Sequence, residues 1–361
     1  MATGKTIFIT GAAGYVGTML VEEFAARKDV TRVIGLDKEP VPDLIKDEPK
    51  LVYLQTNTAD DWEKEVEQYQ PEVVIHAAWQ IREIYGNRAL SWKWNITGSD
   101  KVFEFAFNNP FVKRLVYFSS VASYGSFHDN EVDDLFTEDR CFRESEYLYA
   151  EEKRVAEEHL KERYSRRKNK DIDVSVLRPA AITGPRGRFM RMRFGLQSAL
   201  AGQMKGSIWY RLISLLVSYV PVTPKWLRQF IHEDDVVGIV ERVAFGHPVE
   251  GYEVFNICPP GDVVLGPDMA RAVGKKTIPV HPWLVGVAYF FFWHLTRGVI
   301  PTAPGAWRGY SYPIAVDGSK ATKKLGYEYQ YAGYDAFYYT DGKYESYVPE
   351  EMRRSRAKIA S

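Results

Sequence analysis

Short apolar runs alternate with longer helical stretches through the first half of the chain. Five runs rich in β-branched and aromatic residues are typical of buried strands, at 6–9, 31–36, 51–54, 73–78 and 115–118. Four stretches between and after them predict helices, at 18–28, 62–69, 91–108 and 147–163. This alternation predicts an α/β fold with a parallel sheet covered by helices on both faces.

The turn between the first strand and the first helix carries three glycines at three-residue spacing. Glycine permits positive φ and close approach of the backbone to phosphate groups, and the helix N-terminus presents N–H groups and a dipole to an anion. The spacing is G-x-x-G-x-x-G rather than the G-x-G-x-x-G fingerprint. The turn still predicts a site for a dinucleotide pyrophosphate, with cofactor contacts from Gly11, Ala13, Gly14, Tyr15, Val16 and Gly17.

An acidic residue follows the second predicted strand. Asp37 lies about 20 residues beyond the last glycine, where a carboxylate can accept both hydroxyls of the adenosine ribose. The negative charge would repel a 2′-phosphate, so Asp37 favours NAD. The neighbouring Lys38 keeps NADP open as an alternative.

Candidate catalytic side chains follow the fifth strand. Tyr149 and Lys153 are four residues apart on a predicted helix, so both project from one face. A lysine ammonium and an oxidised nicotinamide would stabilise the phenolate of a tyrosine whose pKa is normally about 10. Ser120, at the end of the strand, would hold the substrate oxygen by a hydrogen bond. Together the three residues predict proton transfer coupled to nicotinamide chemistry.

Composition narrows the class of protein. The 361 residues are 45% hydrophobic and 26% charged, which suits a globular fold, and 47 basic residues balance 47 acidic ones, so we expect no nucleic-acid partner. The two cysteines, Cys141 and Cys258, lack metal-ligand spacing, so no metal site is expected. The N-terminus enters a strand with no signal peptide, which predicts a cytoplasmic protein. His76, at the end of an apolar strand, is interpreted as a structural histidine.

Taken together, the motifs resemble the extended short-chain dehydrogenases/reductases over roughly residues 5 to 330. These are the NAD-dependent sugar-nucleotide epimerases and dehydratases, and the resemblance is to the UDP-galactose 4-epimerase type. The matching stretches are TGAAGYVG (10–17), HAAW (76–79), WNITGS (94–99), YFSSVASYG (117–125), YAEEK (149–153), LRPAAITGP (177–185) and RQFIHEDD (228–235).

The resemblance implies a fold and a set of functional residues. The fold would be a Rossmann doubly wound parallel sheet, Ser120, Tyr149 and Lys153 would be catalytic, and Asn95 would be structural and cofactor-adjacent. It also implies a homodimer formed by two helices of each subunit, and further cofactor contacts from Ala77, Ala78, Ser119, Lys153 and Pro179.

Two departures from the family pattern change the expectations. Where the family often places an acidic residue against the adenine amino group, this chain has Gln55-Thr56-Asn57, so we expect Asn57 to make that contact through its amide. After Ser120 there is no Asp-Glu pair of the kind that 4,6-dehydratases use, which disfavours dehydration.

Domain boundaries follow from the same pattern. We expect residues 1–178 to form an NAD-binding Rossmann domain to which 228–257 returns, 179–227 and 258–347 to form a smaller, mostly helical substrate-binding region, and 348–361 to be a mobile tail. Arginines cluster in the substrate-binding region and suit a diphosphate, which predicts a UDP-sugar substrate held by Arg186, Arg188 and Arg228, with Arg191 and Arg193 nearby.

Two unusually apolar and aromatic segments leave alternatives open. Ile208 to Val222 and Trp283 to Leu295 are both shorter than the ~18 residues of a membrane span, so we expect core or lid segments and no membrane crossing. They also leave open a hydrophobic substrate entrance or peripheral membrane contact. One alternative function is therefore a 3β-hydroxysteroid-dehydrogenase-like enzyme acting on a hydrophobic alcohol or ketone. A second is a non-catalytic NAD(P)-sensing regulatory protein, which the intact Ser120, Tyr149 and Lys153 disfavour.

Overall fold

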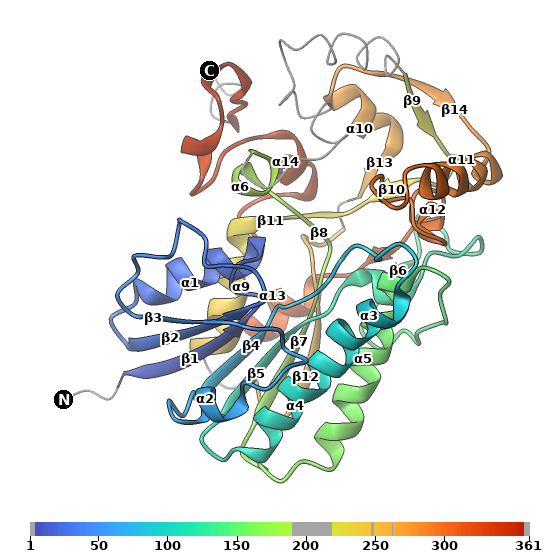
Figure 1. The fold of residues 1–361 in the computed structure, drawn as a ribbon. Helices are drawn as coiled ribbons and strands as arrows, with labels where there is room; N and C mark the ends of the chain where they lie inside the picture. The colour runs from blue at the N-terminus through green and yellow to red at the C-terminus, as the bar shows by residue number, and fades with distance from the viewer. Residues whose placement is uncertain (1–3, 190–218, 247–248, 262, 357–361) are drawn as a thin grey trace. The chain divides into compact units, whose positions relative to one another are not determined.

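The chain divides into two compact units, which are described separately. The computed structural model describes residues 4–189, 219–246, 249–261 and 263–356 (Figure 1). The first unit comprises residues 1–123, 148–178 and 237–255, and the second comprises 124–147, 179–236 and 256–361. The predicted substrate contacts Arg191 and Arg193, and most of the apolar segment 208–222, lie outside the described residues.

The first unit is built on a seven-stranded sheet in the order β12-β7-β5-β4-β1-β2-β3 (Figure 1). Neighbouring strands from β3 to β7 are parallel, which confirms the predicted fold class. The order reverses beside β1, where a doubly wound sheet places its ligands. The strands are β1 (Lys5–Thr10), β2 (Val30–Asp37), β3 (Leu51–Gln55), β4 (Val73–His76), β5 (Arg114–Phe118), β7 (Asp173–Pro179) and β12 (Tyr252–Ile257).

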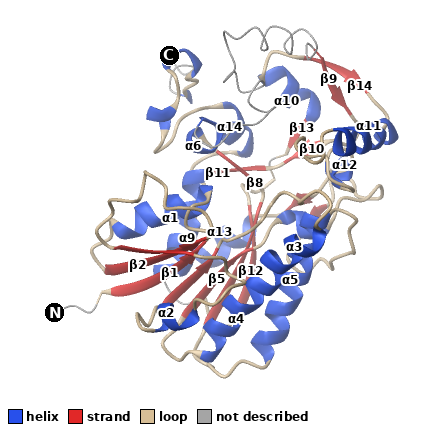
Figure 2. Ribbon diagram, in the orientation of Figure 1, coloured by secondary structure: helices blue, strands red, loops and turns tan. Residues whose placement is uncertain are grey.

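Helices cover both faces of this sheet (Figure 2). On one face Phe8 packs against Trp62 and Phe105, and α4 and α5 lie side by side. On the other face Phe24 of α1 meets Phe245 of α9 edge to face. The helices are α1 (Tyr15–Ala25), α2 (Glu63–Glu67), α3 (Arg88–Trp92), α4 (Gly98–Asn108), α5 (Leu148–Ser165) and α9 (Glu233–Phe245), with a π-helical turn η1 at Lys93–Thr97.

Several element boundaries differ from the sequence prediction. The first helix begins at Tyr15 rather than 18, because Gly14 is extended and ends the turn directly. The fourth strand ends at His76, and the predicted helix 91–108 begins earlier, at Arg88, and is interrupted by the π-helical turn. Strand β7 is not among the strands predicted from the sequence, although its residues Asp173–Leu177 pair with β5.

The second unit contains four two-stranded sheets and short helices. The pairs are β8 (Ala181–Thr183) with β11 (Phe230–His232), β10 (Leu227–Arg228) with β13 (Val264–Leu265), β14 (Lys276–Pro279) with β9 (Tyr219–Val222), and β15 (Ala315–Val316) with β6 (Leu135–Phe136). The helices are α6 (Pro185–Phe189), α10 (Gly266–Ala272), α11 (Pro282–Leu295), α12 (Ala306–Gly309), α13 (Ser319–Leu325) and α14 (Gly333–Tyr338), with single 3-10 turns at Glu345–Tyr347 and Glu350–Met352. A further 3-10 turn, Val121–Tyr124, spans the sequence boundary between the two units. The predicted return of 228–257 to the main sheet therefore holds for β12, whereas β11 pairs with β8 outside that sheet.

The C-terminal segment makes several contacts with the second unit. Thr340 and Arg354 exchange main-chain and side-chain hydrogen bonds, Arg356 donates to Asp341, and Val348 is buried. The polar composition does not reveal these contacts, and the mobility of residues 348–361 stays a prediction. Residues 357–361 lie outside the described part of the chain.

Candidate active site

The glycine-rich turn has the tight geometry that its sequence predicts. Gly11 has a φ of 76°, and a Cβ built there would lie 2.6 Å from the backbone nitrogen of Ala78. A Cβ at Gly17 would lie 2.0 Å from the Gly11 carbonyl oxygen. Side chains at either position would fill the space between the turn, β4 and α1, so both glycines are required sterically. This bare backbone at the start of an eleven-residue helix fits the pyrophosphate of a dinucleotide.

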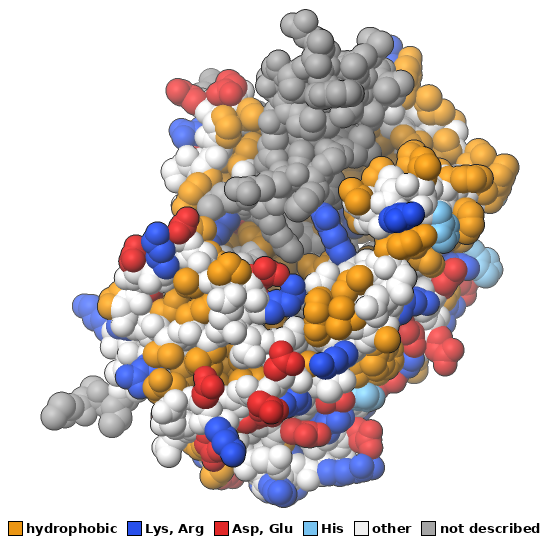
Figure 3. All heavy atoms as spheres, viewed as in Figure 1, with side chains coloured by type: hydrophobic (Ala, Val, Ile, Leu, Met, Phe, Trp, Pro, Cys, Tyr) orange, Lys and Arg blue, Asp and Glu red, His pale blue; other side chains and the backbone are white. Residues whose placement is uncertain are grey.

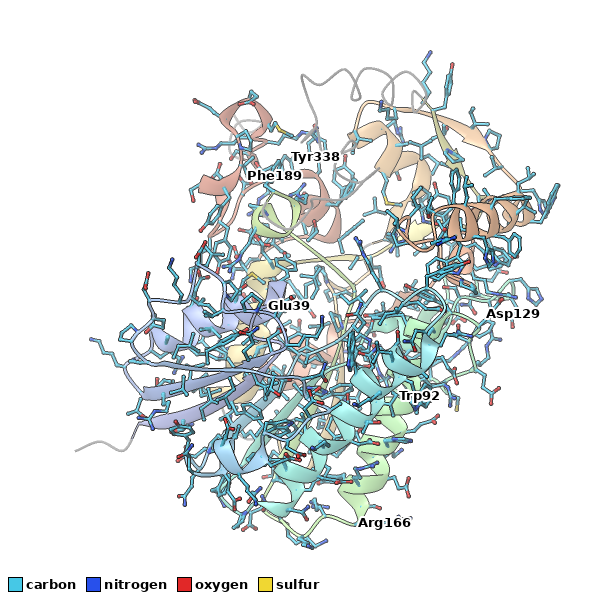
Figure 4. The ribbon with its side chains drawn as sticks, in the orientation of Figure 1. Glu39, Trp92, Asp129, Arg166, Phe189 and Tyr338 are labelled. Carbon is cyan, nitrogen blue, oxygen red and sulfur yellow. The ribbon has the colours of Figure 1, made fainter. Side chains whose placement is uncertain are left out.

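Asp37 braces this turn from the end of β2. Its carboxylate accepts hydrogen bonds from the backbone N–H groups of Ala13 (3.1 Å) and Glu39 (3.0 Å), and Figure 4 labels Glu39. Burial raises the pKa of the Asp37 carboxyl above its usual value, and the two hydrogen bonds oppose that rise. A carboxylate accepts about four hydrogen bonds, so Asp37 retains capacity for ribose hydroxyls.

Asn57 lies in the segment after β3. Its side-chain oxygen accepts a hydrogen bond from the backbone of Ala59 at 2.9 Å. The amide group is thereby oriented, and its contact with adenine stays a prediction.

The end of β4 is held by His76. The imidazole is buried, with Thr10 Oγ1 2.7 Å from Nδ1 and Ser99 Oγ 2.8 Å from Nε2. Burial lowers the pKa of His76 to about 3, so the ring is neutral at physiological pH. Both ring nitrogens are used for internal hydrogen bonds, which agrees with the predicted structural role. The Thr10 carbonyl also accepts from Ala77 N–H at 3.2 Å, which fixes the backbone of Ala77 and Ala78 beside Gly11.

Lys153 is buried beneath the ends of β4 and β5. Its ammonium donates to the carbonyl oxygen of Phe118 at 2.6 Å and lies 3.4 Å from the centroid of the Trp79 ring. Burial lowers the pKa of Lys153 well below its usual value, and the charges of Glu157 and Glu152 oppose this effect. Trp79 was not predicted to contact Lys153, although a bulky aromatic next to the Ala77-Ala78 pair was the available signal.

Ser119 and Ser120 have different roles. Ser119 donates to buried Glu157, and Glu157 also forms a buried ion pair with Arg178 at 2.7 Å. Ser120 is largely buried, and its Oγ accepts from the backbone N–H of Ala122 at 3.1 Å. The Ser120 hydroxyl is the acceptor in this contact, so its own proton can be donated to a substrate oxygen.

Tyr149 lies in the first turn of α5, one helical turn before Lys153. Its phenol is partly exposed, in contrast to the buried lysine. Burial raises the pKa of Tyr117 on β5 well above its usual value, and the charges of Glu157 and of the Tyr149 phenolate add to this rise. The helix thus presents one reachable phenol and one enclosed ammonium on the same face.

Asn95 connects the loop after β4 to helix α5. Its amide accepts from Gln80 N–H (2.7 Å), donates to the Gln80 carbonyl (3.0 Å) and donates to the Glu152 carboxylate (2.6 Å). Burial raises the pKa of Glu152 to about 7, with the Asn95 hydrogen bond opposing the rise and nearby Glu83 adding to it. Asn95 thus makes structural hydrogen bonds, and its contact with the cofactor stays a prediction. Glu152, which lies directly before Lys153, was not predicted from the sequence.

The predicted substrate arginines lie in the second unit and differ from one another. Arg186 is buried, 4.8 Å from the Tyr344 ring centroid. Arg188 donates to the main-chain carbonyls of Ala336, Phe337 and Tyr339, and so links α6 to α14; Figure 4 labels the adjoining Phe189 and Tyr338. Only Arg228, among these three, is exposed. Its substrate contact stays a prediction, and the main-chain role of Arg188 makes that residue the weaker candidate.

Among the described residues, the predicted catalytic and cofactor contacts other than Pro179 all lie in the first unit, whereas Pro179 ends β7 at the start of a segment of the second. No group of three or more His, Cys, Asp or Glu side chains suited to a metal ion occurs in the described part of the chain.

Comparison with known proteins gives a family and several similar folds. The model of the NAD dependent epimerase/dehydratase family matches residues 7–258. The uncharacterized protein Rv0501 of Mycobacterium tuberculosis (strain H37Rv) is 26% identical over 76% of this chain and 68% of its own length.

Solved structures share the fold at low sequence identity. Epimerase Mth375 of Methanothermobacter thermautotrophicus has a TM-score of 0.69 at 18% identity, covering 96% of this chain and 92% of its own. The UDP-glucuronic acid 4-epimerase of Bacillus cereus, solved with a fluorinated UDP-glucuronic acid and NAD, has a TM-score of 0.67 at 18% identity, covering 94% and 99%. MoeE5 in complex with UDP-glucose and NAD has a TM-score of 0.63 at 20% identity, covering 92% and 96%.

Proposed function

This chain belongs to the NAD-dependent epimerase/dehydratase family, and from that membership we propose that it epimerises a nucleotide-diphosphate sugar at a secondary alcohol, as a 4-epimerase does. It is an enzyme of the short-chain dehydrogenase/reductase type, and its cofactor is NAD. The observation that carries the proposal is the hydrogen bond from Lys153 on α5 to the Phe118 carbonyl at the end of β5. Ser120 follows the same strand and Tyr149 lies one helical turn before Lys153, in the unit that also contains the glycine-rich turn.

Tyr149, Lys153 and Ser120 would each have a separate role in the oxidation of the alcohol. NAD, when bound, takes up the hydride of the alcohol carbon and can return it. Tyr149 would accept the hydroxyl proton as the carbonyl forms and give it back when the alcohol is restored. Lys153, held by the Phe118 carbonyl, would favour the phenolate when it is protonated. The charges of Glu157 and Glu152 favour this protonated form and oppose the effect of burial. Ser120 would donate to the substrate oxygen and fix its position during both directions of the reaction.

Support for a nucleotide sugar comes from Arg228 and from the similar folds. Arg228 is exposed on β10. Burial raises the pKa values of Tyr289 and Tyr310, and the charge of Arg228 opposes this rise. An exposed guanidinium suits a diphosphate, which it can hold by two parallel hydrogen bonds. Two of the similar structures hold UDP-glucose or a UDP-glucuronic acid analogue.

The test is a product analysis with and without added cofactor. An epimerase must retain its reduced cofactor until the sugar is restored, so the purified protein should interconvert a UDP-hexose and its 4-epimer without added NAD. Chiral analysis of the sugar and absorbance at the NADH band would be measured together. Stoichiometric NADH accumulation with a released ketone would instead establish a net dehydrogenase.

Arg228→Ala tests the substrate class. We expect this variant to lose activity mainly through a higher KM, because an anchor for the diphosphate binds the ground state and the transition state alike. Lys225→Ala, a nearby lysine that pairs with Glu131, is the matched control for loss of a positive charge. Equal effects of the two changes would show that Arg228 has no specific role.

A second candidate function is dehydrogenation or reduction of a hydrophobic alcohol or ketone, and the exposed aromatic residues of α11 favour it. Turnover of a sterol-like alcohol, with no response to any nucleotide sugar, would transfer the assignment. A homodimer and a cytoplasmic location remain proposals, and light scattering during size-exclusion chromatography tests the first.

A further inference from the structure

Helix α11 is apolar around its whole circumference. Its sequence, PWLVGVAYFFFWHL, contains no charged residue other than a titratable histidine. Val285 and Trp293 are buried on one side, where Gly286 lies against the Trp307 ring of the segment that follows. A helix of this composition is normally enclosed on all sides. Here only one side is enclosed.

The opposite side of α11 exposes large apolar side chains. Phe290 is 61% exposed, Phe291 64% and Leu295 81%, and Val299 just beyond the helix is 78% exposed. Further exposed apolar residues extend this surface, which we call the α11 face: Trp283, Leu284, Val287, Phe292 and Ile300, with Ile278 on β14. Figure 3 shows hydrophobic side chains gathered over this region. Contiguous exposed apolar surface of this kind marks an interaction site.

The stretch of sequence that contains most of the α11 face, residues 269–316, has basic residues but no acidic ones. Although the whole protein has 47 basic and 47 acidic residues, no Asp or Glu occurs between Asp268 and Asp317. Arg271 and Arg308 pair with Asp268 and Glu146. The remaining basic residues of the stretch, which we call the cationic rim, are Lys275, Lys276 at the start of β14 and Arg297 just beyond α11. Lys276 and Arg297 are exposed.

We propose that the α11 face docks the protein on an anionic lipid bilayer, with α11 lying in the plane of the interface. Exposed aromatic and aliphatic side chains flanked by lysine and arginine are what binds a surface of negative headgroups over acyl chains. The helix has 14 residues, and no helix in the described part of the chain is long and apolar enough to cross a membrane. The helix can therefore lie in the interface but cannot span the bilayer.

The charge of the rim favours lipid over a second copy of the chain. A two-fold dimer through this surface would place the same patch of both subunits together. Lys275, Lys276 and Arg297 would then face their own equivalents, with no acidic residue from 269–316 to neutralise them. Anionic headgroups supply that neutralising charge.

The experiment is sedimentation of the full-length protein with sucrose-loaded vesicles, without substrate or added cofactor. We expect binding to vesicles containing 30% phosphatidylglycerol, weak binding to pure phosphatidylcholine, and loss of binding at high salt. The double variant Phe290→Ser/Phe291→Ser should bind at least tenfold more weakly, because it removes two of the most exposed apolar side chains. Lys276→Gln/Arg297→Gln should weaken binding by roughly 30-fold, from about 1 kcal/mol for each charge.

The matched control is Trp92→Ser. Trp92 is an exposed aromatic on α3 in the other unit, labelled in Figure 4, and its loss should leave vesicle binding unchanged. Because the proposal does not depend on the substrate, nucleotide-sugar turnover of the two double variants should match the wild type and would also show that they fold.

Three results would overturn the proposal. The first is equal binding of the wild type and the variants to anionic vesicles. The second is a dimer in light scattering that Phe290→Ser/Phe291→Ser dissociates, with no vesicle binding by the wild type. The third is loss of turnover of a hydrophobic alcohol in that variant without vesicle binding, which would make the α11 face a substrate entrance.

Discussion

The buried carboxyl of Glu152 makes the stability of this protein depend on pH in a calculable way. Glu152 is 1% exposed, and its pKa rises from 4.5 to about 7 chiefly through burial. An acid whose pKa is raised by folding retains its proton in the folded state after the unfolded chain has released it. Stability therefore falls as pH rises from 4.5 to about 7, and the full penalty, about 3 kcal/mol, applies above that range.

Glu152→Gln removes this ionisation and keeps an oxygen that can accept from Asn95 Nδ2. We expect the variant to be more stable than the wild type by about 3 kcal/mol at pH 8, with the difference shrinking towards a constant offset at pH 5. Urea unfolding at pH 5, 6, 7 and 8 measures the difference directly. Glu158→Gln, on the exposed side of the same helix, is the control and should show no comparable trend. A difference between Glu152→Gln and wild type that stays the same from pH 5 to pH 8 would refute the reasoning.

Three further predictions concern the active site. Tyr149→Phe should retain the fold and NAD binding but lose roughly 10²-fold or more in turnover, the scale of a positioned acid or base, and wild-type-like turnover on the true substrate would remove Tyr149 from the mechanism. Asp37→Ala should weaken NAD binding and relax discrimination against NADP, as titration of both cofactors would measure, whereas an unchanged preference would show that the carboxylate only braces Ala13. Gly17→Ala should abolish NAD binding or the fold, because its Cβ would lie 2.0 Å from the Gly11 carbonyl oxygen, and calorimetry showing wild-type affinity would contradict that geometry.

Local sequence was sufficient for the parts of the site that depend on neighbouring residues. The glycine turn, the strand preceding it and the Tyr149–Lys153 pair each lie within a short segment whose spacing fixes their geometry. The predicted parallel sheet follows from alternation along the chain, and the structure confirms it. Family membership confirms the predicted NAD cofactor.

Contacts between residues far apart in the chain could not be predicted from the sequence. Asn95 reaches Glu152 across 57 positions, and Trp79 covers Lys153 from another strand end, so no local spacing reports either pair. The same reason explains why the hydrogen bonds between Thr340 and Arg354 could not be predicted from the composition of the C-terminal segment. The roles of Arg186 and Arg188 also depend on partners about 150 residues away, namely Tyr344 and the carbonyls of α14.

The π-helical turn at Lys93–Thr97 contains Asn95, which holds the loop after β4, and precedes α4, which packs on the sheet. A π turn holds one residue more than an α turn, so losing a residue there would close the turn to ordinary geometry and leave the flanking helices facing as they do now. Losing a residue within α4 would instead rotate all that follows by about 100° and carry Phe103 and Phe105 away from the sheet. Deletion of one residue at this turn should therefore preserve the core packing of α4 but break the hydrogen bonds between Asn95 and Gln80. The extra residue of the π-helical turn therefore serves to position Asn95 against the backbone of Gln80 in the loop after β4. The packing of α4 on the sheet does not depend on it.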